Sequence, residues 1–92
     1  MAAERLRAIV RGRVQAVGFR AYAYGRARSR GLSGWVRNRP DGTVECVAEG
    51  PRAQLDALLQ DLRNGPPSAR IKQVDCEFEP ARGDLDAFDV RF

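Results

Sequence analysis

Apolar residues in this chain follow two different spacings, and the order of those spacings constrains the fold more than any other feature of the sequence. Four segments place an apolar residue at every second position, as a strand with one buried face requires. Two segments place them three and four positions apart, which is the spacing of a helix packed on a core. The expected elements are, in order, strand 5–11, helix 19–30, strand 32–39, strand 43–49, a helix that opens at Pro51 and ends before Asn64, strand 71–78 and a short strand over 88–92.

This order of elements predicts an α+β fold of the ferredoxin-like βαββαβ type with one additional strand. Two helices should cover one face of a mostly antiparallel sheet, forming a two-layer sandwich. Because a crossover from strand through helix to strand is almost always right-handed, the first two strands should run parallel. Their C-terminal ends then lie at the same edge of the sheet. The length of 92 residues suits one domain, residues 1–92, without a second core.

The chain contains no histidine. This excludes histidine acid–base catalysis, phosphohistidine intermediates and the commonest transition-metal ligand. The two cysteines, Cys46 and Cys76, are expected to be small core residues with free thiols. No apolar run of about 18 residues exists, and the N-terminus lacks the apolar stretch of a signal peptide. We therefore expect a cytoplasmic protein without a membrane partner.

Positive charge is concentrated in the first part of the chain. Residues 1–40 hold ten arginines and one acidic residue, whereas residues 41–92 hold six basic and eleven acidic residues. The basic part is expected to attract an anion, and a phosphate, a nucleic acid and an acidic protein are all open alternatives. Three arginines of the first expected helix, Arg26, Arg28 and Arg30, are expected to form a solvated face.

A loop bounded by glycines, residues 12–18, connects the first expected strand to the first expected helix. The first N–H groups of a helix have no intrahelical partner and carry partial positive charge, so the loop can wrap amides around a phosphate. Arg20, in the first turn, would add a charge with bidentate geometry. The loop lacks the GK[ST] ending of a Walker A loop. On composition alone, a structural turn with a solvated Arg20 is the alternative.

Asn38 ends the second expected strand, at the same sheet edge as the loop. It shares a strand face with Val36, which should be the face covered by helices. Its side chain would then point toward the loop and Arg20. An asparagine so close to Pro40 is also a common turn residue, which is the alternative interpretation.

Two segments resemble signatures of the acylphosphatase family. The run VQAVGFR at residues 14–20 resembles the family's V-Q-G-V-x-F-R, and GWVRN at residues 34–38 resembles its G-W-V-x-N. Residues 41–44 and 49–51 also resemble family positions. The resemblance covers essentially the whole chain. It implies an enzyme without a metal or a cofactor that hydrolyses the carboxyl-phosphate bond of acyl phosphates, yielding a carboxylate and inorganic phosphate.

Carried over position by position, the resemblance implies that Arg20 binds the phosphoryl group and that Asn38 orients the attacking water. It also implies a phosphate cradle made by the backbone amides of Gln15, Ala16, Val17, Gly18, Phe19 and Arg20. The family usually has glycine where this chain has Ala16. If this position needs a positive φ, alanine costs about 1 kcal/mol or more, which puts the rate of turnover in doubt more than phosphate binding.

The implied reaction suits a chain without histidine, because a carboxylate whose conjugate acid has a pKa of about 4 leaves without a general acid. Two alternatives stay open at this point: a nucleic-acid-binding module, and a phosphate sensor without turnover. Against the first, strand 43–49 has no aromatic residue for base stacking, and Glu45 and Glu49 would repel phosphates. We expect a monomeric enzyme that acts on a small-molecule acyl phosphate and has no nucleic-acid partner.

Overall fold

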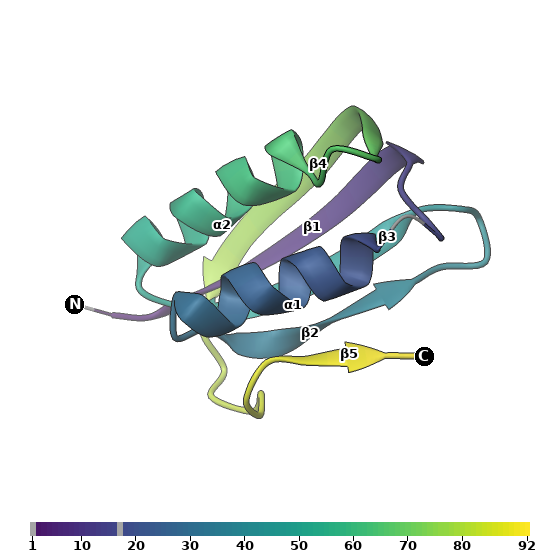
Figure 1. Ribbon diagram of the computed structural model, residues 1–92. Helices are drawn as coiled ribbons and strands as arrows, with labels where there is room; N and C mark the ends of the chain where they lie inside the picture. Colours follow the sequence, from purple (N-terminus) through teal and green to yellow (C-terminus); the bar gives the residue numbers. More distant parts are fainter. Residues whose placement is uncertain (1, 17) are drawn as a thin grey trace.

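The computed structural model describes residues 2–16 and 18–92, and its elements follow the expected order. The bounds are β1 (Glu4–Arg13), α1 (Phe19–Ser29), β2 (Ser33–Asn38), β3 (Val44–Gly50), α2 (Arg52–Asn64), β4 (Arg70–Pro80) and β5 (Asp89–Arg91). Both helices lie on the same face of the sheet, as Figure 1 shows. The protein therefore has the predicted α+β, ferredoxin-like architecture.

The sheet has the strand order β4-β1-β3-β2-β5. β1 pairs antiparallel with β3 and β4, and β2 pairs antiparallel with β3. β1 and β2 are therefore parallel to each other, as predicted, with β3 between them. β5 adds to the far side of β2 in parallel. The ends of β1 and β2 thus reach the same edge of the sheet, where α1 begins.

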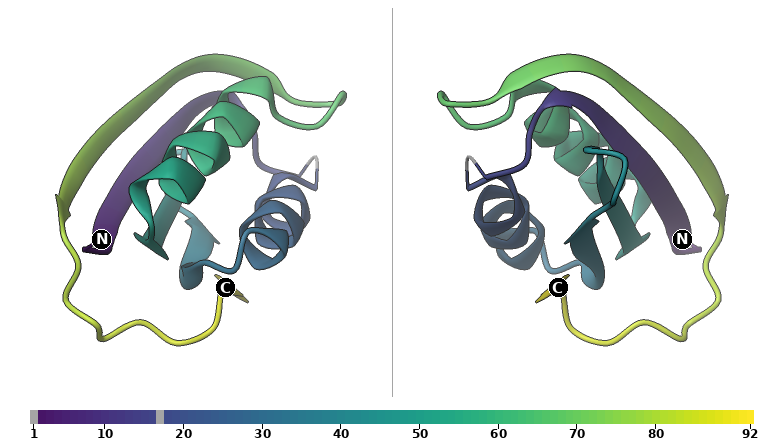
Figure 2. Two further views of the ribbon diagram at one scale, coloured as in Figure 1. Left: turned by 90° about the vertical axis from the view of Figure 1, so that its left-hand side faces the viewer. Right: turned by 90° about the vertical axis from the view of Figure 1, so that its right-hand side faces the viewer.

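The core lies between the sheet and the two helices. On β1, Leu6, Ala8 and Val10 are fully buried beneath the helices. The stripe of α2 packs against them through Leu55, Leu58, Leu59 and Leu62. Burying one leucine fully stabilises the fold by about 1.5–3 kcal/mol, so this stripe holds α2 on the sheet. Figure 2 shows the sheet curving around both helices. Neither described helix has the length and apolar character needed to cross a bilayer.

The end of β1 differs from the sequence prediction. The strand continues through Gly12 and Arg13, which pair with β4 beyond a shift in register. Gly12 has a φ of 132°, and a Cβ there would overlap the carbonyl oxygen of Arg70. The predicted loop is therefore shorter and begins at Val14, because Gly12 allows the two strands to stay in close contact.

Two smaller predictions were wrong. Pro51 is the N-cap of α2 rather than its first helical residue. Cys46 is buried as expected, but Cys76 is exposed. The reason is that β4 is an edge strand on which no side chain is fully buried. Its alternating residues Val74 and Phe78 pack against the core, but Cys76 on the same strand stays exposed.

The sheet face away from the helices carries arginines paired with carboxylates. Glu45 on β3 accepts hydrogen bonds from Arg7 on β1 at 2.8 Å and from Arg37 on β2 at 2.7 Å. Glu49 accepts one from Arg5 at 2.6 Å. We call these five residues the open-face network. Burial acts to raise the pKa of Glu45, but hydrogen bonds from the two arginines outweigh it, and the pKa lies below the ordinary value of 4.5.

These ion pairs change how the concentration of arginines in residues 1–40 is interpreted. Five of the ten arginines in residues 1–40 pair with carboxylates from the second part of the chain: Arg5, Arg7, Arg11, Arg30 and Arg37. Arg30, expected to be solvated, bonds Asp61 at 2.8 Å and joins α1 to α2. Half of the arginines in residues 1–40 are therefore paired with carboxylates within the fold.

Candidate active site

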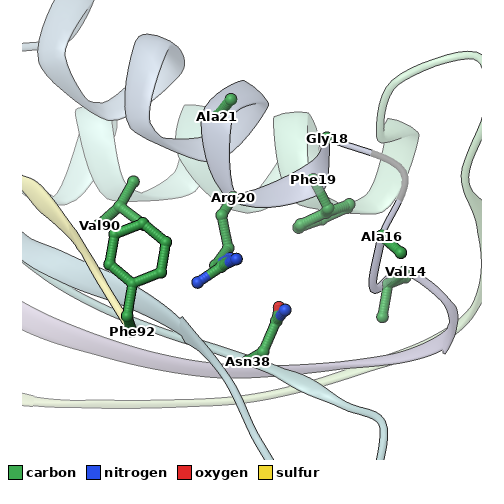
Figure 3. A pocket seen from close by; sticks show the side chains of 9 residues that line it. All are labelled: Val14, Ala16, Gly18, Phe19, Arg20, Ala21, Asn38, Val90 and Phe92. Carbon is green, nitrogen blue, oxygen red and sulfur yellow. The ribbon is translucent and has the colours of Figure 1, made fainter.

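A pocket opens where β2 ends, between the start of α1 and β5 (Figure 3). Its volume of about 280 Å³ suits a small molecule. Two polar side chains, Arg20 and Asn38, point into it, so the fold brings together the two residues that lie far apart in the sequence. The lining residues are Val14, Ala16, Gly18, Phe19, Arg20, Ala21, Asn38, Val90 and Phe92.

The loop between β1 and α1 forms one wall of the pocket. Ala16 has a φ of 59°, so it meets the condition under which the sequence predicted backbone strain. Gly18 has a φ of 75° and is the N-cap of α1, with no side-chain hydrogen bond to cap the helix. The first amides of α1 therefore remain available at the pocket. Val17, which the family resemblance assigns to the phosphate cradle, lies outside the described residues.

Arg20 enters the pocket from the first turn of α1. Its Nη1 donates to the carbonyl oxygen of Arg91 at 3.1 Å, and its guanidinium carbon lies 4.6 Å from the centre of the Phe92 ring. Within residues 2–16 and 18–92, no carboxylate forms an ion pair with it. β5 thus orients the guanidinium without neutralising its charge.

Asn38 is the last residue of β2, and its side chain faces the guanidinium of Arg20 across the pocket (Figure 3). Its Oδ1 is buried and has no hydrogen-bond partner among the described residues. Leaving a buried acceptor unpaired costs about 1–3 kcal/mol, and such an atom in a pocket indicates a site for a water or a ligand.

Sequence reasoning missed the side chain of Gln15. Its Nε2 donates to the carbonyl oxygens of Arg39 at 2.7 Å and Thr43 at 2.9 Å. These carbonyls belong to the turn that follows Asn38, so Gln15 ties the loop to the β2–β3 hairpin. The sequence contains no local signal for this contact, because the partners are backbone atoms more than twenty residues away.

Sequence reasoning also missed Val90 and Phe92, which it treated as strand residues alone. They line the pocket because β5 pairs with β2 and runs past the start of α1. The alternating pattern predicted a strand here but not its neighbour.

This arrangement can hold a phosphate-sized anion beside one ordered water, using the charge of Arg20, helix-start amides and the Asn38 carboxamide. Cys46 lies in the core outside the pocket lining, and burial raises its pKa to about 12, so it is not a thiolate near neutral pH. Among the described residues, no group of three or more His, Cys, Asp or Glu side chains could bind a metal ion.

Comparisons with known proteins agree with this geometry. The acylphosphatase family model matches residues 6–90. The chain is 49% identical over 88 residues to an acylphosphatase of Anaeromyxobacter dehalogenans, covering 96% of this chain and 95% of that protein. It is 46% identical over 85 residues to one from Acaryochloris marina, covering 92% and 90%. The crystal structure of acylphosphatase from Bacillus subtilis matches with a TM-score of 0.93 at 36% identity, covering 97% of this chain and 99% of that chain.

The match extends well beyond the two short motifs and includes both sides of the pocket. Family, relatives and fold lead to one assignment: this chain belongs to the acylphosphatase family and is a hydrolase that converts acyl phosphates to carboxylate and phosphate.

Proposed function

We propose that the pocket at the end of β2 is the site of hydrolysis and that Arg20 and Asn38 perform different parts of the reaction. The observation that carries this proposal is the convergence of an uncompensated guanidinium and a buried, unpartnered amide oxygen in one hollow. Arg20 and the backbone amides of residues 15–20 bind the phosphoryl group. Asn38 binds the water.

The reaction follows from these roles. Asn38 Oδ1 accepts a hydrogen bond from the water and holds its oxygen in line with the phosphorus. The water oxygen attacks phosphorus, the bond from phosphorus to the acyl oxygen breaks, and the carboxylate leaves with the bonding electrons. One proton of the water passes to a phosphoryl oxygen of the substrate, and the other stays on the attacking oxygen, so the products are the carboxylate and dihydrogen phosphate. Arg20 and the amides stabilise the charge on the equatorial oxygens as the loose transition state forms.

We also propose that residues 1–92 form one acylphosphatase domain that acts as a monomer in the cytoplasm, without a nucleic-acid or membrane partner. The shared core of both helices and the sheet supports a single domain. The free thiols Cys46 and Cys76 support a reducing compartment. Glu45 and Glu49 at the centre of the open sheet face oppose the binding of a phosphate backbone there.

The test is hydrolysis of a simple aryl acyl phosphate by the unaltered protein and by Asn38→Ala. The unaltered protein should turn over, with inorganic phosphate as a competitive inhibitor and no effect of EDTA. Asn38→Ala should lower kcat at least about 100-fold while the phosphate inhibition constant changes by less than about threefold. Asn64→Ala, at the end of α2, is the matched control and should keep full activity. An active Asn38→Ala would refute the role given to this residue.

A further inference from the structure

Gln15 links the pocket loop to the turn between β2 and β3. Its side chain is half-buried, and its Nε2 lies 2.7 Å from the carbonyl oxygen of Arg39 and 2.9 Å from that of Thr43. A side-chain amide has two N–H hydrogens, which is one for each of these acceptors. A carboxylate has none, and an alkyl side chain of similar size has none either. The contact therefore depends on the amide.

The turn that Gln15 contacts is well ordered by its own hydrogen bonds. The N–H of Arg39 donates to the carbonyl oxygen of Thr43 at 2.9 Å, and the N–H of Gly42 donates to that of Arg39 at 3.1 Å. The carboxylate of Asp41 accepts from the N–H of Thr43 at 3.0 Å and from its hydroxyl at 2.6 Å. Because Asn38 directly precedes this turn, the hydrogen bonds of the turn also restrict the position of Asn38.

The loop on the other side needs outside support. Ala16, the residue after Gln15, has a φ of 59°. The left-handed region costs a residue with a Cβ about 1–2 kcal/mol, so this conformation persists where surrounding contacts hold it. The two hydrogen bonds of Gln15 are contacts of that kind, placed one residue before the strained position.

We propose that Gln15 is a positioning residue, which sets the distance between the phosphate-binding loop and Asn38. Its side chain then governs the rate of the chemical step more than the affinity for phosphate. This inference rests on the roles proposed for Arg20 and Asn38. A misplacement of about 1 Å between reacting groups can slow a reaction about 100-fold, so releasing the loop should lower kcat about tenfold or more.

The test compares Gln15→Glu, Gln15→Leu and the charge-matched control Gln60→Glu, whose site is exposed on α2. The kcat and KM for a simple aryl acyl phosphate and the inhibition constant of inorganic phosphate are measured from pH 4.5 to 7.5. Each kcat is divided by that of the unaltered protein at the same pH, which cancels the ionisation of the substrate. Near-ultraviolet circular dichroism verifies folding, and Gln15→Leu decides the outcome if Gln15→Glu does not fold.

Few other groups titrate around position 15 in this range. The ionisable residues of the adjoining segments include Arg11, Arg13, Arg20, Arg39 and Asp41. Hydrogen bonds from the side chain and backbone of Thr43 hold the pKa of Asp41 below its ordinary value of 3.8, so this carboxyl stays charged throughout. A change with pH that is unique to Gln15→Glu therefore reports the introduced carboxyl.

Gln15→Glu should lose about tenfold in kcat at pH 7.5 and recover much of it toward pH 4.5, because a protonated carboxyl can donate one hydrogen bond to the turn. Gln15→Leu should stay slow at every pH, and Gln60→Glu should match the unaltered protein. The phosphate inhibition constant should change by less than about threefold. Wild-type kcat in folded Gln15 variants, a loss in Gln15→Glu that is independent of pH, or an equal loss of kcat and phosphate affinity would each overturn the inference.

Asn38→Ala, measured alongside, separates the two proposals. If Asn38→Ala is inactive while the Gln15 variants are fully active, the positioning role alone fails. If Asn38→Ala is active, the proposed function itself fails.

Discussion

Arginines occupy two contrasting environments in this protein. In the open-face network, Arg5, Arg7 and Arg37 are held by buried carboxylates. In the pocket, Arg20 is held by a backbone carbonyl and an aromatic ring. Both environments order the guanidinium, but the pocket leaves its positive charge uncompensated. The contrast shows that the number of arginines in a segment does not identify an anion site. Arg20 is distinguished by lying in the pocket beside Asn38 without a carboxylate partner among the described residues.

The contrast has a topological cause. β3 lies between β1 and β2, and its register sets Glu49 opposite Arg5 and Glu45 opposite Arg37. Cross-strand pairs of opposite charge stabilise a sheet. Arg20 instead lies on a helix start beyond the end of β2, outside the reach of these cross-strand partners. The carboxylates of β3 thus neutralise Arg5, Arg7 and Arg37, whereas Arg20 lies outside their reach.

The largest expected effect comes from removing Arg20. Arg20→Ala should lower kcat/KM at least about 1000-fold and abolish inhibition by phosphate, because it removes the charge that we propose binds the phosphoryl group. The matched variant is Arg11→Ala, which breaks a half-exposed pair with Asp75 at 2.8 Å. It should change kcat/KM by less than about twofold and stability by less than about 1 kcal/mol. Steady-state kinetics on an aryl acyl phosphate distinguishes the two variants. Similar kinetics for both would contradict the proposed difference between Arg20 and the arginines paired with carboxylates.

In contrast to Arg20→Ala, removing Glu45 should lower stability and leave activity nearly unchanged. Glu45→Ala breaks two charged hydrogen bonds, but Arg7 and Arg37 have side chains 44% and 50% exposed and can return to water. We expect a loss of about 2 kcal/mol in the free energy of unfolding and a kcat within about threefold of the unaltered protein. Glu77→Ala, whose side chain is 67% exposed, should cost less than about 0.5 kcal/mol. Urea titration measures both, and equal costs would be the contrary result.

Protonating the network should have a smaller effect than deleting a carboxylate. Burial acts to raise the pKa of Glu49, but hydrogen bonds from the backbone of Arg82, from Arg5 and from Gly83 outweigh it, as the two arginines do for Glu45. Both pKa values lie below the ordinary 4.5. Their stabilisation is therefore complete above about pH 4.5 and is lost as the pH falls through the lowered values.

Unfolding in urea at pH 7, 5 and 3 measures this dependence. The contribution of Glu45 and Glu49 to the free energy of unfolding should be nearly the same at pH 7 and pH 5, and it should be smaller at pH 3. The double variant Glu45→Gln/Glu49→Gln should show a flatter dependence between pH 5 and pH 3. An unchanged slope in that variant would assign the acid sensitivity to other carboxyls.

The smallest expected effect concerns the strained residue of the pocket loop. Ala16→Gly should raise kcat by less than about fivefold, because glycine adopts a φ near 59° without steric cost. Its free energy of unfolding should change by less than about 1 kcal/mol, since the greater freedom of glycine in the unfolded chain offsets the relief of strain. Ala16→Val is the opposing variant and should slow turnover. An increase in kcat with valine would show that strain at this position does not limit the reaction.

Local patterns in the sequence were sufficient for the order of elements and for the two motifs of the pocket. The alternation in β1 and the leucine stripe of α2 each act within one segment, so neighbouring residues carry the signal. Handedness of the crossover then brought Arg20 and Asn38 to one edge of the sheet. The same reasoning was wrong for Cys76 and Arg30, whose surroundings depend on distant segments.

What the sequence by itself determined is therefore the fold class and the meeting of Arg20 and Asn38 at one edge of the sheet, because hydrophobic spacing and chain handedness are local properties. The tertiary structure alone decided which arginines are neutralised, that β5 orients Arg20, and that Gln15 contacts the turn after Asn38. These features depend on the order of strands in the sheet and on their register. Strand order and register are determined by contacts between segments that are far apart in the chain, so they cannot be predicted from a short run of residues.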